Sequence, residues 1–365
     1  MKEYKLSEIL TIKNGRDYKN LKNGLYPVYG SGGLMCTVDN YLYEHPSVLL
    51  PRKGTLSNIQ FADSPFWTVD TLYYTEIDTH LADPYYLYYY LKQLDLTRLD
   101  SGTGVPSMTF DSYYNIKVCL PNIDKQRAVG QLLSVVDDKI QLNKRINDNL
   151  EAMAKQLYDY WFVQFDFPNE EGKPYKSSGG AMVWNEMLKR EIPQGWDFCF
   201  LEHLLTIRNG RDHKHLADGI YPVYGSGGEM RKVSEYLYDG ESVLMPRKGS
   251  LNNIMYVNEA FWTVDTMFYS EMKLSNCAKY IYYTIKDIDF TRWNSGTGVP
   301  SMTSSTLYSI KLVKPQSEIL KKFDKMISPL FEHMKQISVQ NAELIKQRDE
   351  LLPLLMNGQA TVNSD

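Results

Sequence analysis

Arginine, lysine and asparagine stand together in a short motif that occurs twice, NGRDxK at residues 14–19 and 209–214. A guanidinium can hold a guanine edge through two hydrogen bonds, and an asparagine amide can do the same for adenine. A second motif, PRKG at residues 51–54 and 246–249, follows an apolar run and suits contacts to phosphates or base edges. The alternatives are a charged turn with an Arg–Asp pair and a solvated strand end. The candidate residues are Asn14, Arg16, Lys19, Arg52, Lys53, Asn209, Arg211, Lys214, Arg247 and Lys248.

Two small polar loops repeat in the same way. GSGG at residues 30–33 and 225–228 could offer main-chain N–H groups to a phosphate, because glycine lets the backbone approach closely. SGTGVPSMT at residues 101–109 and 295–303 is unchanged between the copies, and its hydroxyls suit phosphates and base edges. The alternatives are a tight loop between strands and a structural turn. The candidates from these loops, with the arginines just ahead of the longer one, are Ser31, Arg98, Thr103, Ser107, Ser226, Arg292, Thr297 and Ser301.

These motifs belong to a duplication that covers most of the chain. Residues 11–35 return as residues 206–230 with 18 of 25 positions identical, and FWTVDT at residues 66–71 recurs at residues 261–266. So long a period marks a duplicated domain rather than a solenoid repeat. Two copies of one surface suit a target that itself comes in two halves. We expect the tryptophans of FWTVDT to lie in the core.

The elements that must position these loops are strands followed by a helix in each copy. Runs rich in Tyr, Val and Thr, punctuated by Gly and Pro, predict β-strands, and residues 84–99 and 280–293 turn helical. From residues 126 and 323 onward, apolar positions step by four and three, as in a coiled-coil seam. We expect two antiparallel helices, each about 37 residues and ~55 Å long. The expected seam includes Ile140, Asn147, Leu150, Leu157, Met334, Asn341, Leu344 and Leu351.

Each seam carries a polar residue near its middle, Asn147 in the first and Asn341 in the second. A buried Asn lowers stability but fixes the register, because few pairings satisfy its amide. Pro329 should kink the second helix or mark a late start. The expected fold class is α+β, with two duplicated mixed α/β domains separated by two long antiparallel coiled-coil helices. The expected parts are a first globular domain at residues 1–124, a central helix at 125–162, a connector at 163–196, a second globular domain at 197–315 and a C-terminal helix at 316–356.

The composition argues against several classes of protein. The chain of 365 residues has a net charge of −4, and residues 1–125 hold 12 Lys and Arg against 14 Asp and Glu. A self-sufficient DNA binder would usually show a basic face, although a subunit that reads bases while its partners hold phosphates need not. The four cysteines form no CxxC, which argues against disulfides and a metal site. We find no signal peptide and no apolar run near the ~18 residues of a membrane span, so we expect a cytoplasmic protein without a membrane partner.

The motifs YPVYGSGG, PRKG followed by FWTVDT, and GTGVPSMT resemble the target-recognition domains of Type I restriction–modification specificity subunits. So do the heptad helices, the connector DFPNEEGKPYKSSGG…REIPQGW and the closing RDELLPLLMNGQ, so the resemblance covers essentially the whole chain in the right order. It implies a non-catalytic subunit that binds a bipartite double-stranded DNA sequence. Its helices would also dock two adenine methyltransferase subunits, and restriction (helicase-nuclease) subunits join that core to make the nuclease.

The resemblance also implies that the chain binds no cofactor and that S-adenosylmethionine lies on the partner methyltransferase. In this family the two recognition domains are often dissimilar, whereas here they are near copies, so we expect an inverted-repeat target. One alternative is a stand-alone DNA methyltransferase or nuclease. The chain has no Pro-Pro dipeptide, and hence no loop of the (D/N/S)-P-P-(Y/F/W) type with which adenine methyltransferases grip the base. Another alternative is a scaffold that reads no DNA, but the unchanged motifs lie in the globular parts.

Overall fold

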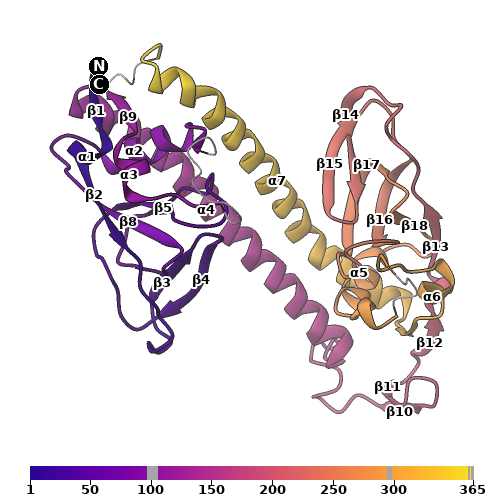
Figure 1. Cartoon of the computed structure of the whole chain (residues 1–365). Coiled ribbons are helices and arrows are strands. Elements are labelled where there is room, and N and C mark those ends of the chain that lie inside the picture. The colour runs from indigo at the N-terminus through magenta and orange to yellow at the C-terminus, as the bar shows by residue number, and fades with distance from the viewer. Residues whose placement is uncertain (97–105, 294–297, 361, 363–365) are drawn as a thin grey trace. The chain divides into compact units, whose positions relative to one another are not determined.

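The computed structural model describes residues 1–96, 106–293, 298–360 and 362, and it divides the chain into two compact units. Unit 1 comprises Met1–Arg145 and Ile337–Asp365, and unit 2 comprises Ile146–Gln336. Two long helices contribute to both units (Figure 1): α4, Ile123–Tyr158, has 36 residues, and α7, Ser317–Met356, has 40 residues. A π-helical turn, Asp159–Val163, extends α4.

Unit 1 builds three small sheets from short strands rich in β-branched and aromatic residues. Its elements are β1 (Lys2–Lys5), α1 (Leu6–Ile9), β2 (Leu10–Asn14), β3 (Tyr26–Gly30), β4 (Gly33–Val38), β5 (Ser47–Pro51), β6 (Gln60–Ala62), β7 (Trp67–Thr68), β8 (Leu72–Ile77), α2 (Pro84–Lys92), α3 (Phe110–Tyr114) and β9 (Lys117–Leu120). The sheets have the orders β2–β8–β5–β6, β4–β3–β7 and β1–β9. Strand β5 lies between two neighbours and is buried along its whole length.

Unit 2 repeats this sequence of elements. They are β10 (Met182–Asn185) and β11 (Arg190–Pro193) from the connector, then β12 (Asp197–Phe200), β13 (Leu205–Asn209), β14 (Asp218–Gly225), β15 (Gly228–Val233), β16 (Tyr238–Pro246), β17 (Met255–Thr263), β18 (Met267–Met272), α5 (Ala278–Lys286), α6 (Ser304–Tyr308) and β19 (Lys311–Lys314), with short 3₁₀ turns at Leu201–His203 and Phe290–Trp293. Its main sheet is six-stranded, in the order β13–β18–β16–β17–β14–β15. Strands β12 and β19 pair separately, as do β10 and β11.

One proline explains why the main sheet is continuous in unit 2 and split in unit 1. Strand β17 runs unbroken through Ala260, which pairs with Asp239. At the equivalent place unit 1 has Pro65, and the chain there forms two shorter strands, β6 and β7. Proline has no N–H to donate to a ladder, so Pro65 cannot continue the strand that ends at Ala62.

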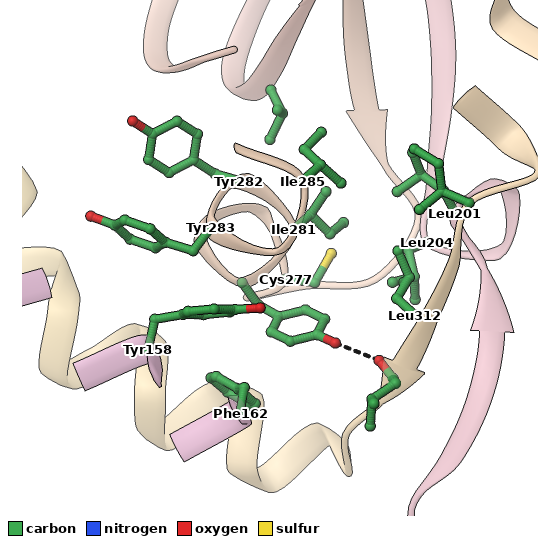
Figure 2. Close-up of a cluster of buried hydrophobic side chains, with 14 of the residues drawn as sticks. Tyr158, Phe162, Leu201, Leu204, Cys277, Ile281, Tyr282, Tyr283, Ile285 and Leu312 are labelled. Carbon is green, nitrogen blue, oxygen red and sulfur yellow. Dashed lines mark hydrogen bonds between the residues drawn. The ribbon is translucent and has the colours of Figure 1, made fainter. Parts of the chain in front are cut away.

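Aromatic side chains from the long helix complete the core of unit 2. Figure 2 shows Tyr158 and Phe162 reaching the core beside helix α5, with Leu201 and Leu204 on the other side of that helix. The hydroxyl of Tyr280 donates to the carbonyl oxygen of Val313 at 2.5 Å, so this buried ring keeps its polar atom satisfied. Much of the tyrosine content of the chain is therefore structural, with Tyr86, Tyr89, Tyr113, Tyr280 and Tyr283 fully buried.

The long helices pair antiparallel within unit 1. Asn143 donates through Nδ2 to Oδ1 of Asn341 at 2.8 Å, and Asn341 donates through Nδ2 to the carbonyl of Ile140 at 3.4 Å. Nearer the start of α4, Asp137 Oδ1 lies 2.8 Å from Nη1 of Arg348. Residue numbers rise on α7 as they fall on α4, which is the antiparallel arrangement expected from the sequence.

The helix segments of unit 2 pair in the same sense. Asn147 donates through Nδ2 to the carbonyl of Met334 at 3.4 Å. Further along α4, the rings of Trp161 and Phe323 lie 5.6 Å apart. The remaining expected seam residues are half-buried: Leu150 and Leu157 in unit 2, and Leu344 in unit 1.

Two details of the helices differ from the expectation. Helix α7 starts at Ser317, well before Pro329, so this proline does not mark a late start. Leu351 is 44% exposed, whereas Leu352 and Leu355 pack against the core of unit 1. Beyond Arg348 the side of α7 that packs against the core of unit 1 therefore carries Leu352 and Leu355 in place of Leu351. Among the described residues, no helix is long and apolar enough to cross a membrane.

Candidate nucleic-acid interface

Three segments that are distant in sequence meet at one place in unit 1. Asn14 ends strand β2, and Arg52 and Lys53 follow directly after strand β5. Lys53 forms an isolated antiparallel bridge with Ser107, and the N–H of Met108 donates to the carbonyl of Arg52 at 3.0 Å. The end of the SGTGVPSMT loop is therefore held against the PRKG turn by main-chain hydrogen bonds, and the side chains of both are presented together.

These segments enclose an open hollow of about 320 Å³. Four of the predicted contact residues, Asn14, Arg52, Lys53 and Ser107, lie in its lining. The structure thus brings together amide, guanidinium, ammonium and hydroxyl groups, which are the polar groups that hold phosphates and base edges. The complete lining is Asn14, Arg52, Lys53, Tyr73, Ser107, Met108, Thr109 and Phe110.

Unit 2 has the same hollow, with a volume of about 270 Å³. The bridge between Lys248 and Ser301 recurs, and Met302 donates its N–H to the carbonyl of Arg247 at 2.8 Å. Four predicted contact residues again lie together, although they come from segments about 40 to 50 residues apart. The complete lining is Asn209, Arg247, Lys248, Phe268, Ser301, Met302, Thr303 and Ser304.

The cations at each hollow keep most of their donors available. Nη1 of Arg52 donates to the main-chain carbonyl of Asp70 at 3.4 Å, and Arg247 makes the same contact with Asp265 at 3.4 Å. A guanidinium has five N–H donors, so one such bond orients it without using it up. Within the described parts of the chain, Arg52, Lys53, Arg247 and Lys248 form no ion pair: no carboxylate oxygen lies within 4.0 Å of their charged nitrogen atoms.

A rigid turn follows strand β2 and carries Arg16. The main-chain N–H of Arg16 donates to the carbonyl of Thr68 at 2.8 Å, and its carbonyl accepts from Nε1 of Trp67 at 2.8 Å. A Cβ on Gly15 would lie 2.0 Å from the carbonyl oxygen of Val69, so only glycine fits there. Trp67 is 8% exposed and is therefore a core residue, as expected, whose indole N–H anchors the turn.

The matching turn in unit 2 has the same anchors. Arg211 donates its N–H to the carbonyl of Thr263 at 2.8 Å and accepts from Nε1 of Trp262 at 2.9 Å. A Cβ on Gly210 would lie 2.0 Å from the carbonyl oxygen of Val264. Each turn thus presents an exposed arginine from a fixed backbone, beside the strand end that carries the asparagine of the hollow.

The lysines of the NGRDxK motif lie on exposed turns. Oδ1 of Asp17 accepts from the main-chain N–H of Lys19 at 3.1 Å, and Asp212 accepts from Lys214 at 3.3 Å. Each aspartate therefore closes its turn, the local role that Asp commonly takes. The ammonium groups are solvent-exposed, and Lys19 and Lys214 do not line the hollows.

The GSGG motif is the turn of a β-hairpin. Gly30 pairs with Gly33, and Gly33 has φ of 120°, a value that side-chain-bearing residues rarely adopt. The hairpin tip touches the PRKG turn, because a Cβ on Gly54 would lie 3.3 Å from Oγ of Ser31. In unit 2, Ser226 lines an adjoining hollow of about 430 Å³ together with Lys248 and Ser301.

The remaining predicted residue that the structure describes, Arg292, does not join a hollow. Its side chain is 81% exposed, and Nε lies 3.1 Å from Oδ2 of Asp289. The pKa of Asp289 is lowered because Thr291 and Asn252 donate hydrogen bonds to its carboxylate, with a smaller contribution from Arg292. Arg98, Thr103 and Thr297 lie outside the described residues.

The prediction from sequence missed four lining positions in each hollow. Tyr73 and Phe268 lie on strands β8 and β18, directly after the FWTVDT blocks, where they look like ordinary strand residues. Thr109 and Thr303 close the unchanged loop, and each caps the short helix that follows, accepting from an N–H three residues on at 3.2 Å. The repeat could have pointed to one of these positions, because Phe110 and Ser304 are the first residues that differ between the copies after the unchanged SGTGVPSMT block. Met108 and Met302 complete the set.

Two equivalent mixed α/β domains, each with a cationic hollow and each followed by a long helix, define a class of protein with duplicated recognition domains. A family model described as the Type I restriction modification DNA specificity domain matches residues 1–152 and 193–341. The chain belongs to this family.

Curated relatives resemble the chain over most of its length. The Type I restriction enzyme MjaIX specificity subunit of Methanocaldococcus jannaschii is 24% identical over 354 residues, covering 88% of this chain and 79% of that protein. The HindI specificity subunit of Haemophilus influenzae is 22% identical over 343 residues, covering 74% of each. A crystal structure of the S subunit of a Type I restriction–modification system from M. genitalium superimposes with a TM-score of 0.67 at 18% identity, covering 100% of this chain and 96% of that one. This likeness confirms the expected fold class.

Proposed function

We propose that the chain is the non-catalytic DNA-specificity subunit of a Type I restriction–modification complex and reads a bipartite target, one half-site with each hollow-bearing domain. The observation that carries the proposal is the matched pair of hollows. In each, an asparagine, an arginine, a lysine and a serine from three separate segments converge. A scaffold that reads no DNA has no use for such a constellation in duplicate. Because most lining residues agree, the two half-sites should be near-identical and inverted.

We further propose that the outer faces of the helices dock two methyltransferase subunits, which would carry S-adenosylmethionine, and that restriction subunits join this core. Leu132, Val135 and Leu142 of α4 are 38%, 60% and 49% exposed in unit 1. Their spacing of three and seven residues places them on one helix face, away from the seam. Exposed apolar residues gathered on one face commonly mark an interface with another protein.

The test is a mobility-shift experiment on target DNA with the chain alone and with its methyltransferase. The chain alone should bind weakly, because its acidic balance supplies few phosphate contacts, and the methyltransferase should raise the affinity. In the complex, Arg52→Ala/Lys53→Ala and Arg247→Ala/Lys248→Ala should each weaken binding and lower the slope of log affinity against log salt by roughly 2.

The matched controls are Lys117→Ala and Lys311→Ala, which occupy equivalent positions on strands β9 and β19, away from the hollows. Each removes one exposed positive charge and should leave the affinity within about twofold of the wild type, since a distant exposed charge is screened by salt. Equal losses from the control and hollow variants would contradict the proposed interface. So would equal affinity with and without the methyltransferase.

A further inference from the structure

The two hollows can be compared position by position, because their linings are equivalent in the repeat. Six of the eight lining residues are the same in both hollows. The two differences are Tyr73 against Phe268 and Phe110 against Ser304. Any difference in what the hollows bind through their own linings must therefore come from these two positions.

The first difference lies inside the protein. Tyr73 and Phe268 are 5% and 3% exposed, so neither ring offers much surface to a ligand. The hydroxyl that distinguishes them donates to the main-chain carbonyl of Met108 at 3.2 Å. This bond ties Tyr73 to the end of the SGTGVPSMT loop and gives its buried hydroxyl a partner inside the protein.

The second difference is partly exposed to solvent. Phe110 and Ser304 are each the first residue of a short helix, α3 and α6, and both side chains are only half-buried. The Phe110 ring packs edge-on against Tyr73, with centroids 4.7 Å apart. Unit 1 thus has an apolar aromatic wall where unit 2 has a small hydroxyl, beside the same asparagine, arginine and lysine.

We infer that Phe110 makes the domain of unit 1 prefer thymine at one position of its half-site, and that the domain of unit 2 lacks this preference. The inference rests on the proposed function. In the major groove, thymine alone presents a C5-methyl group, and a phenyl ring is one of the side chains that contact it. A serine hydroxyl can donate to or accept from several base edges, so it discriminates less. The target would then be an inverted repeat that is broken at a single position.

The experiment expresses the full chain with its methyltransferase in a host without adenine methylation, and reads the methylated motif by single-molecule sequencing. The wild-type motif should show two matching half-sites, with thymine preferred at one position of one half only. Phe110→Ser should lower that preference by roughly tenfold, while Ser304→Phe should create it at the matching position of the other half. Phe110→Leu, which stays apolar, should keep most of it.

Lys117→Ala is the control, because this residue lies on strand β9 outside the hollow and its loss should leave the motif unchanged. Thermal melting of each purified chain checks folding, and Ser304→Phe keeps the test decisive if Phe110→Ser does not fold. An unchanged motif in both exchange variants, with methylation intact, would overturn the role of Phe110 alone. No sequence-specific methylation by the wild-type complex would overturn the proposed function as well.

Discussion

The side-chain amide of Asn341 donates to the main-chain carbonyl of Ile140 at 3.4 Å. Asn147 makes the same contact with Met334 at 3.4 Å. In the repeat, Asn147 is equivalent to Asn341 and Met334 is equivalent to Ile140. One type of contact is therefore used in both units. An asparagine that must reach a particular carbonyl tolerates no slip of one helix along the other, so these two bonds fix the register of the pair.

The amide network around Asn143 should behave as a coupled pair. Asn143 is buried and donates to Asn341 Oδ1 and to Gln340 Oε1, both at 2.8 Å. We expect Asn143→Leu to lower the free energy of unfolding by about 1–3 kcal/mol, because it leaves polar atoms of Asn341 unsatisfied. The double change Asn143→Leu/Asn341→Leu should recover most of that loss.

Denaturant unfolding of the two single variants and the double variant measures this coupling, with exposed Asn149→Leu as the control on the same helix. The control should change stability by less than about 0.5 kcal/mol. Additive losses in the double variant would show that the amides do not act as a pair.

The apolar part of the seam should be needed for stability. Leu150 of α4 and Leu344 of α7 are half-buried and occupy equivalent positions of the repeat. Leu150→Asp/Leu344→Asp places a carboxylate in each apolar contact and should lower stability on the order of 2–3 kcal/mol per site. Thermal melting and co-purification of the methyltransferase check this, and the double variant should fail in both. An unchanged melting temperature would show that Leu150 and Leu344 are not part of the seam.

Substitutions on the outward face of α4 should impair docking of the methyltransferase without impairing folding. Val135 and Leu142 are exposed, so Val135→Asp/Leu142→Asp should leave the melting temperature within a few degrees of the wild type. The same variant should lose the co-purified methyltransferase, because a charged pair cannot be desolvated in an apolar interface. Normal co-purification would place the docking surface elsewhere on the chain.

Stability should fall at alkaline pH partly through a buried thiol. Burial raises the pKa of Cys199 from 9.0 to about 11, against a smaller lowering by Lys314. Between these values the unfolded chain loses the thiol proton while the folded chain keeps it, so unfolding becomes easier as pH rises. Tyrosines also ionise in this range, so the comparison must be made between variants. From pH 8.5 to 10.5, Cys199→Ala should lose about 1–2 kcal/mol less stability than the wild type. Equal losses would contradict this assignment.

The repeat made much of this molecule predictable, because each motif could be checked against its second copy. It marked Asn14, Arg52, Lys53 and Ser107 as candidates in separate motifs, and the structure brings these four together. The place of Phe110 in the hollow depends on how α3 packs on Tyr73 of strand β8. No local sequence pattern predicts this packing.

Local details were lost for similar reasons. Leu351 follows the heptad pattern but is 44% exposed, whereas its neighbour Leu352 packs against the core of unit 1. Pro329 was expected to kink the second helix or to mark a late start, and the late start is wrong because α7 already begins at Ser317.

The closed turns at Gly15 and Gly210 limit how such a protein can acquire a new target. Each turn is pinned by a tryptophan indole and a strand carbonyl, and no side chain fits at its glycine. The backbone of each turn therefore has one fixed path, and a change at Arg16 or Arg211 alters the exposed side chain without altering that path. If these arginines contact the target, a new specificity can arise at this place by side-chain exchange alone.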